Sequence, residues 1–337
     1  MNKLLFSCLC LLIISQVIIS CENENHKENF FVVEVDSIEN NDTTNIPQYS
    51  FENLINKIKI HFTAKIIGKG IIDNIDPKFG PLMPDSLRGQ GMAIFNNYMF
   101  RLHLTGICCI YDLSDIDNIK YVNSYKLGSY SHVNHANVAQ FSNEVIPETG
   151  FPLLYLSPVY PKYPCVVEKV SLDSSSLVQK IIPTKNGYSM LRDWIIGDDN
   201  YLWGIGSDGN SRTKDYTLNY YKLKLPEISE GNITIKTEDA IDYFEDNEDW
   251  EDIPSTYQGG MVHKGKLYHL FGTKHIKREL RVYDTKTHKR IAIIDLNEIT
   301  KEEPEDLDVW QDNKIIISLA GVDHAIMLEF EDNTLFP

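Results

Sequence analysis

The stretch RGQGMAIFNNYMFRLHL, residues 88–104, introduces a pattern that recurs along the chain. A polar opening that contains glycine precedes a short alternating segment, an Asn-Asn turn and a second alternating segment. Turn residues of this kind between two alternating segments predict a β-hairpin. Four further units begin with similar polar openings, at His132, Met190, Tyr257 and Glu303.

Every unit then continues with another strand-like segment: ICCIYDLSD, CVVEKVSLD, LNYYKLKLP, LRVYDTKTHKRIAIIDL and AIMLEFE. Helical periodicity is nearly absent. A unit of short strands that recurs every 45 to 65 residues or so is typical of a propeller blade. We therefore predict an all-β fold, a β-propeller with five blades. Six blades are the alternative, because the long spacing between the third and fourth units leaves room for a degenerate one.

The two ends of the repeat region complement each other. The last unit ends after three strands, whereas residues 58–68, IKIHFTAKIIG, form an additional strand before the first unit. We predict that this strand completes the last blade, because pairing it there hides an edge that would otherwise promote aggregation.

The N-terminal residues have the pattern of a targeting signal. An apolar run follows Lys3 and ends at Ile18-Ile19-Ser20-Cys21, and it is too short for a comfortable transmembrane span. The pattern resembles bacterial lipoprotein signals. The resemblance implies that residues 1–20 are a signal peptide and that Cys21 carries acyl chains that hold the protein to a membrane. An ordinary signal peptide or a membrane anchor is the alternative.

Residues 21–50 are rich in Asn, Glu and Asp and have little apolar periodicity, so we predict a flexible tether. Glu22 and Glu24 resemble the acidic start of Bacteroides-type surface lipoproteins. That similarity implies a lipoprotein of the bacterial cell envelope, anchored in the outer membrane, and leaves the periplasmic and surface faces equally open. Residues 51–337 would then form the propeller domain, which we expect to be a monomer.

The charge of the chain restricts its partners. With 32 basic and 48 acidic residues the formal net charge is −16, and no basic patch is present, so nucleic acid is not expected to bind. The densest acidic run, residues 238–252, offers carboxylates to Ca²⁺. Its spacing is not that of an EF-hand, and a solvated loop is the preferred interpretation.

Three cysteines follow Cys21 in the sequence. Cys108 and Cys109 are adjacent on a predicted strand and point to opposite faces, so only one of them could meet Cys165. Three buried thiols are the alternative, and the spacing fits no zinc site.

Polar residues at the five openings should converge, because the first strand of every propeller blade lines the central channel. Burying such groups is costly unless they pair, bind water or meet a ligand. We therefore predict a site at the channel mouth that binds a glycan or peptide, with hydrogen bonds between blades as the alternative. The predicted ligand-binding residues are Gln90, Asn137, Arg192, Asp193, Gln258 and Glu305. For sugar stacking, Trp194 and Trp250 are expected to be exposed.

An enzyme acting at the same site is the second hypothesis. The openings RGQGM, NHANV, YQGGM and EPEDL resemble the inner-strand series of propellers in phage receptor-binding proteins and related teichoic-acid-directed lyases. Asp306 stands where a glycine is usual in that series. The chain is also similar to uncharacterised propeller lipoproteins of Bacteroides-like bacteria, a similarity that implies fold and location but no chemistry.

For a lyase or hydrolase of polysaccharide or teichoic-acid-type polymers, His135 is the candidate base and Glu305 the acid, while Arg192 neutralises substrate charge. Glu305 and Asp306 are also candidate metal ligands. Because a single histidine on a propeller strand is more often structural, we rank binding above catalysis. A structural scaffold in the envelope is the third hypothesis.

Overall fold

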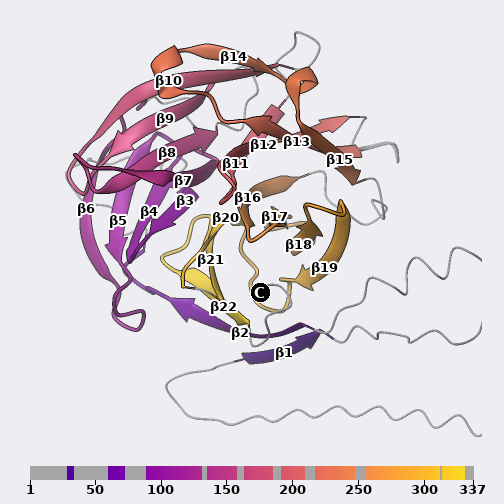
Figure 1. Cartoon of the computed structure of the whole chain (residues 1–337). Helices are drawn as coiled ribbons and strands as arrows, with labels where there is room; N and C mark the ends of the chain where they lie inside the picture. The colour runs from indigo at the N-terminus through magenta and orange to yellow at the C-terminus, as the bar shows by residue number, and fades with distance from the viewer. Residues whose placement is uncertain are drawn as a thin grey trace, which may run out of the picture.

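The computed structural model describes nine parts of the 337-residue chain: 29–33, 60–72, 89–130, 135–157, 163–184, 191–208, 217–246, 256–311 and 313–330. Their regular structure is β-strand except for two short 3-10 helices. The strands form five sheets arranged in a ring (Figure 1), with the first strand of every repeat unit at the centre. The predicted five-bladed β-propeller is confirmed, and the six-blade alternative is wrong.

The first and second blades each follow the chain outward from the centre. The first contains β3 (Gly89–Phe95), β4 (Tyr98–His103), β5 (Ile107–Asp112) and β6 (Lys120–Lys126). The second contains β7 (Val138–Ile146), β8 (Phe151–Ser157), β9 (Cys165–Val170) and β10 (Ser175–Thr184).

The remaining three blades repeat this order. The third contains β11 (Leu191–Ile196), β12 (Tyr201–Asp208), β13 (Thr217–Lys224) and β15 (Asp242–Asp246). The fourth contains β16 (Tyr257–His263), β17 (Lys266–Phe271), β18 (Glu279–Asp284) and β19 (Lys289–Asp295). The fifth contains β20 (Pro304–Val309), β21 (Lys314–Leu319) and β22 (Ala325–Phe330) from the end of the chain.

The core lies between the blades. Alternation along each strand places one apolar face against each neighbouring blade, so five clusters of buried residues fill the five spaces of the ring. The turns between the first two strands use left-handed residues, such as Asn96 at φ 54° and Asn200 at φ 61°, as the hairpin prediction requires.

The ring closes by the predicted pairing. Strand β2 (Ile60–Ile67) runs antiparallel to β22, with Phe62 opposite Phe330 and Ile67 opposite Ala325. Phe62 packs in the core between the fourth and fifth blades, and Ile67 packs between the fifth and first. Strand β1 (Asn29–Val33) pairs with the other edge of β2 and lies inside the predicted tether, 21–50, where no strand was expected.

One segment departs from the repeat. Between β13 and β15 the chain crosses from the third blade to the second, where β14 (Ile233–Lys236) pairs in parallel with β10. The helices η3 (Ile228–Glu230) and η4 (Thr237–Asp239) flank β14. This excursion, residues 225–241, occupies part of the long spacing between the third and fourth units.

The cysteines of the described residues form no disulfide. Cys108, Cys109 and Cys165 are free and buried, so the alternative of three buried thiols holds. Burial raises the pKa of the Cys165 thiol to about 12, which keeps it protonated at neutral pH. No helix within the described ranges has both the length and the apolar character needed to cross a membrane.

Candidate functional site

The inner strands begin with bulges. In four of the five blades the register between the first two strands shifts within the first residues, and Gln90, Arg192, Gln258 and Glu305 lie in these shifts. A bulge redirects side chains out of the regular alternation. Four of the six residues that the sequence predicted for ligand binding therefore lie at a bulge, whereas Asn137 and Asp193 do not.

These side chains bond to one another at the start of the channel. Gln90, Asn137, Asp193, Gln258 and Glu305 are each 5% exposed or less. Three hydrogen bonds join neighbouring blades: Gln90 Nε2 to Glu305 Oε1 at 3.2 Å, Asn137 Nδ2 to Asp193 Oδ1 at 2.7 Å, and Gln258 Nε2 to Glu303 Oε1 at 3.0 Å. The structure thus brings the predicted residues together as pairs between blades. Their predicted contacts with a ligand stay a prediction.

Asp306 crosses the channel. Its carboxylate accepts hydrogen bonds from the backbone amides of Met92 at 2.8 Å, Ala139 at 2.9 Å and Leu307 at 2.9 Å, so it joins the first, second and fifth blades. The absence of a side chain at Gly259 makes room, because a Cβ there would lie 2.1 Å from Asp306 Oδ1. Burial raises the pKa of this carboxyl well above its usual range.

The missing side chain at Gly259 thus makes room for an aspartate at position 306. No group of three or more His, Cys, Asp or Glu side chains in the described ranges is placed to hold a metal ion. The metal role predicted for Glu305 and Asp306, and a Ca²⁺ site in the acidic run, stay predictions.

Among the described residues, no hydrogen bond or ion pair joins the candidate base His135 to the candidate acid Glu305. His135 is partly buried just before β7, and burial lowers its pKa to about 4, so it is neutral at pH 7. Arg192 lies in β11, but the structure does not describe its side chain. Cys21 and Trp250 lie outside the described residues. Trp194 is 3% exposed, so its predicted exposure is wrong. Its side chain packs in the cluster between the second and third blades.

The other end of the channel opens into a pocket. This channel pocket has a volume of about 240 Å³ and is lined by the middle of β7 and by the ends of the other four inner strands or the turns that follow them. Its polar lining residues are Gln140, Ser142, Asn143, Asp198, His263 and Asp308. Sequence reasoning missed them because it considered only the strand openings. Asp308 carried a signal, since it is two residues after Asp306 and alternate residues of a strand share a face.

Asp308 is a buried acid of the channel pocket. It accepts hydrogen bonds from the amides of Ile94 at 2.6 Å and Val309 at 2.7 Å, and burial raises its pKa to about 7. Elsewhere in the lining, His263 Nδ1 lies 3.6 Å from Asp198 Oδ2, and Asn143 Nδ2 donates to the Asp198 carbonyl at 2.8 Å. The pocket thus combines ionisable groups with amide and imidazole donors.

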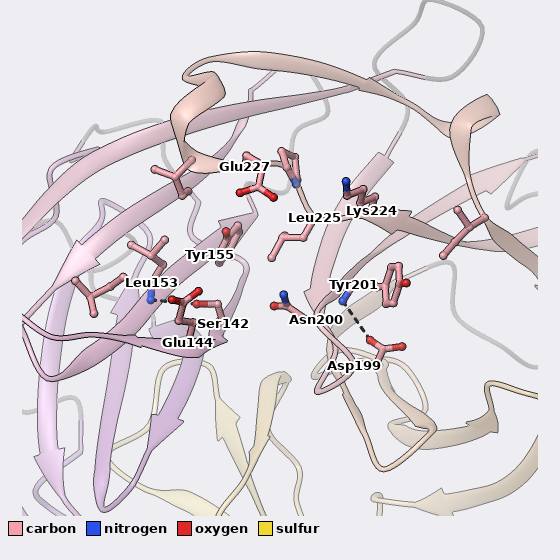
Figure 2. A pocket seen from close by; sticks show the side chains of 14 residues that line it. Ser142, Glu144, Leu153, Tyr155, Asp199, Asn200, Tyr201, Lys224, Leu225 and Glu227 are labelled. Carbon is pink, nitrogen blue, oxygen red and sulfur yellow. Dashed lines mark hydrogen bonds between the residues drawn. The ribbon is translucent and has the colours of Figure 1, made fainter.

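A second, larger cavity of about 450 Å³ lies between the second and third blades (Figure 2). We call it the side cleft. It shares Ser142 with the channel pocket, and Leu225–Ile228 of the excursion form one of its walls. Sequence reasoning missed this cleft because it predicted neither β14 nor the crossing between blades.

Comparisons with known proteins add similarity in fold alone. No protein-family model and no curated protein matches the chain. Among solved structures, glutaminyl cyclase of Myxococcus xanthus is similar at 11% identity and a TM-score of 0.43, over 72% of this chain and 91% of that one. The β-propeller domain of Myceliophteria thermophila Cps50 (Swd1) is similar at 6% identity and a TM-score of 0.40, over 72% and 82% of the two chains.

Proposed function

We propose that this protein is a lipid-anchored protein of the bacterial envelope that binds a glycan or peptide at the channel pocket without changing it. The observation that carries the proposal is that all five inner strands supply lining residues to this one pocket. Residues so far apart in the sequence meet there only because the ring is closed. Ligand sites are usually concave and contain a few convergent polar groups. The channel pocket has both features.

The chemistry of the pocket suits hydroxyl and amide groups of a ligand. Asn143 and His263 carry nitrogen donors, while Asp198 and Asp308 carry carboxylate acceptors. The polar groups at both ends of the channel bond between blades, but those at this end also line a cavity of about 240 Å³. We therefore place the ligand where the inner strands end rather than where they begin.

Recognition fits the geometry better than catalysis. A pKa near 7 would suit Asp308 to proton transfer, but each of its carboxylate oxygens already accepts a backbone amide. His135, the predicted base, lies before β7 at the opposite end of the channel and has a pKa of about 4. These placements support a role for the pocket in binding.

Ligand affinity should depend on the ionisation of Asp308. Full-length protein in detergent would be screened by calorimetry against oligosaccharides of N-acetylglucosamine, mannose and glucose and against a tetrapeptide library. The carboxyl loses its proton as pH rises through about 7, and a carboxylate accepts stronger hydrogen bonds than a carboxylic acid. We expect the best ligand to bind up to about tenfold more tightly at pH 8 than at pH 6 in the parent, and Asp308→Asn to abolish this difference.

Asp173→Asn, an exposed carboxylate in the turn between β9 and β10, is the matched control and should keep the parental pH profile. A pH profile of Asp308→Asn identical to that of the parent would contradict a ligand site at this pocket. Turnover of any bound oligosaccharide or peptide would contradict a purely binding role.

The lipid anchor is tested separately. Cys21→Ser removes the thiol that would carry the acyl chains, so the protein should remain uncleaved and move out of the detergent phase on phase separation. The expected shift is nearly complete, because each buried acyl methylene contributes about 0.8 kcal/mol of membrane affinity. Cys10→Ser, in the predicted signal peptide, should change neither cleavage nor partition. Retention of Cys21→Ser in the detergent phase at the parental level would refute the anchor.

A further inference from the structure

The side cleft is built by the one segment that breaks the repeat. The end of β7 and the start of β8 form one side, the turn between β11 and β12 forms another, and the excursion covers them (Figure 2). In solenoid and propeller proteins, insertions on a repeated scaffold often form the binding face.

Hydrogen bonds to the second blade hold the excursion in place. Gln179 Nε2 donates to the carbonyl of Glu227 at 2.8 Å, and the Lys180 amide donates to Asn232 Oδ1 at 3.1 Å. Ile228 packs against the buried cluster between the second and third blades, together with Ile233. The wall that Leu225–Ile228 present to the cleft is therefore fixed before any ligand arrives.

The floor of the cleft contains an unused hydrogen-bonding group. Tyr155 is 3% exposed and lines the cavity, and its hydroxyl has no hydrogen-bond partner among the described residues. Burial and the nearby Glu227 carboxylate raise its pKa above the usual range, so it stays protonated. The hydroxyl is not among the fully buried polar atoms that lack a partner, so it is accessible from the cavity, where a ligand or solvent can bond to it.

The charge of the lining is negative. Glu144, Asp199 and Glu227 face one basic residue of the cleft, Lys224. Asp199 already pairs with Lys222 at 2.5 Å, so Glu144 and Glu227 are the carboxylates left for a ligand. The chain as a whole has a net charge of −16, which also attracts cations.

The rest of the lining is aliphatic. Leu153, Leu225 and Ile228 line the cavity, and Ile241, which is 60% exposed, stands at its rim. The Tyr201 ring has the Lys222 ammonium 4.4 Å from its centre, so one of its faces is not available for stacking on a sugar. An aliphatic lining beside carboxylates suits an apolar side chain next to a basic one better than it suits a glycan.

We propose that the side cleft is a second binding site, distinct from the channel pocket, for a peptide segment that carries a basic side chain next to an apolar one. The basic group meets Glu144 and Glu227, the apolar side chain lies on Leu153 and Leu225, and the Tyr155 hydroxyl bonds to the peptide backbone. The cavity of about 450 Å³ is in the range of small-ligand sites and is large enough for a short segment.

The test uses full-length protein in detergent and three tetrapeptides with acetylated and amidated ends: Gly-Arg-Leu-Gly, Gly-Glu-Leu-Gly and Gly-Arg-Ser-Gly. Calorimetry should show the Arg-Leu peptide binding at least about tenfold more tightly than the Glu-Leu peptide and several-fold more tightly than the Arg-Ser peptide. Glu227→Gln and Glu144→Gln should each lower the affinity for the Arg-Leu peptide several-fold. Tyr155→Phe keeps the aromatic ring, and it should lower the affinity for the same peptide about fivefold without lowering the melting temperature of the protein.

Glu148→Gln is the matched control, because this exposed carboxylate lies in the turn after β7 and does not line the cleft. It should leave the affinity unchanged, as should Asp308→Asn in the channel pocket. The proposal is overturned if Glu148→Gln weakens binding as much as Glu227→Gln, or if the Glu-Leu peptide binds equally well. Loss of binding in Asp308→Asn would place the peptide in the channel pocket, and oligosaccharide binding that needs Tyr155 would assign the cleft to a glycan.

Discussion

A protein that starts at residue 69, and therefore lacks β2, is expected to lose cooperative unfolding and to aggregate. Without β2 the backbone groups of β22 form an open edge, and an open edge pairs readily with other chains. The cores on both sides also lose the buried side chains of Phe62, Ala64 and Ile67. Burial of a large apolar side chain contributes about 1.5 to 3 kcal/mol, so the loss approaches the whole stability of a typical domain.

Calorimetry and size-exclusion chromatography measure this effect against a protein that starts at residue 51. That control keeps β2 and lacks β1, and it should unfold cooperatively within a few degrees of the parent. If the protein starting at 69 were as stable as the one starting at 51, β2 would not close the ring. If the proteins starting at 51 and at 69 were equally unstable, β1 would be needed to close the ring as well as β2.

Replacing Arg281 should be the most destabilising single change in the described chain. Arg281 is 1% exposed, and its guanidinium lies 3.2 Å from Asp246 Oδ2 and 3.2 Å from Glu279 Oε2. Asp246 ends β15, so its ion pair with Arg281 joins the third and fourth blades, whereas Glu279 and Arg281 both lie on β18. Arg281→Met would remove the buried cation that these carboxylates share, leaving Arg290 beside Asp246 and the exposed Lys277 beside Glu279. Breaking a buried ion pair in this way typically costs about 3 to 5 kcal/mol.

Chemical denaturation of the full chain measures this loss. Arg290→Met is the matched control, since Arg290 also approaches Asp246, at 3.5 Å, but its side chain is 12% exposed. Its removal should cost about 1 kcal/mol or less. Combining Arg281→Met with Asp246→Asn and Glu279→Gln should restore most of the stability, because no buried charge is then left unpaired. A loss below about 1 kcal/mol for Arg281→Met alone would contradict this account.

The architecture was predictable because its signals are local. The hairpin turns at Asn96 and Asn200 need left-handed residues, and the period of two along each strand shows which residues face a neighbouring blade. The strand at 58–68 was predicted to close the ring because the last unit ended one strand short of a complete blade. Each inference used residues close together in the sequence or a count of strands.

The contacts of the channel were only partly predictable. The openings indicated that Gln90, Gln258 and Glu305 would gather, and they do lie at one end of the channel. Whether they would bond to one another or turn toward a ligand depends on the bulges and on the angle between blades, which no local pattern encodes. Trp194 shows the same limit, because its polar neighbours suggested exposure whereas its face of β11 packs on the second blade.

The sequence by itself predicted the repeated strand pattern of the blades, favoured five blades over six, and predicted the closure between the two ends of the repeat region. These follow from alternation, turn chemistry and the need of every strand edge for a partner. Only the tertiary structure decided that Asp306 spans three blades beside Gly259, that the inner strands end in a pocket, and that the excursion 225–241 covers a cleft. These features arise from distances between segments far apart in the chain, which become defined only when the ring closes.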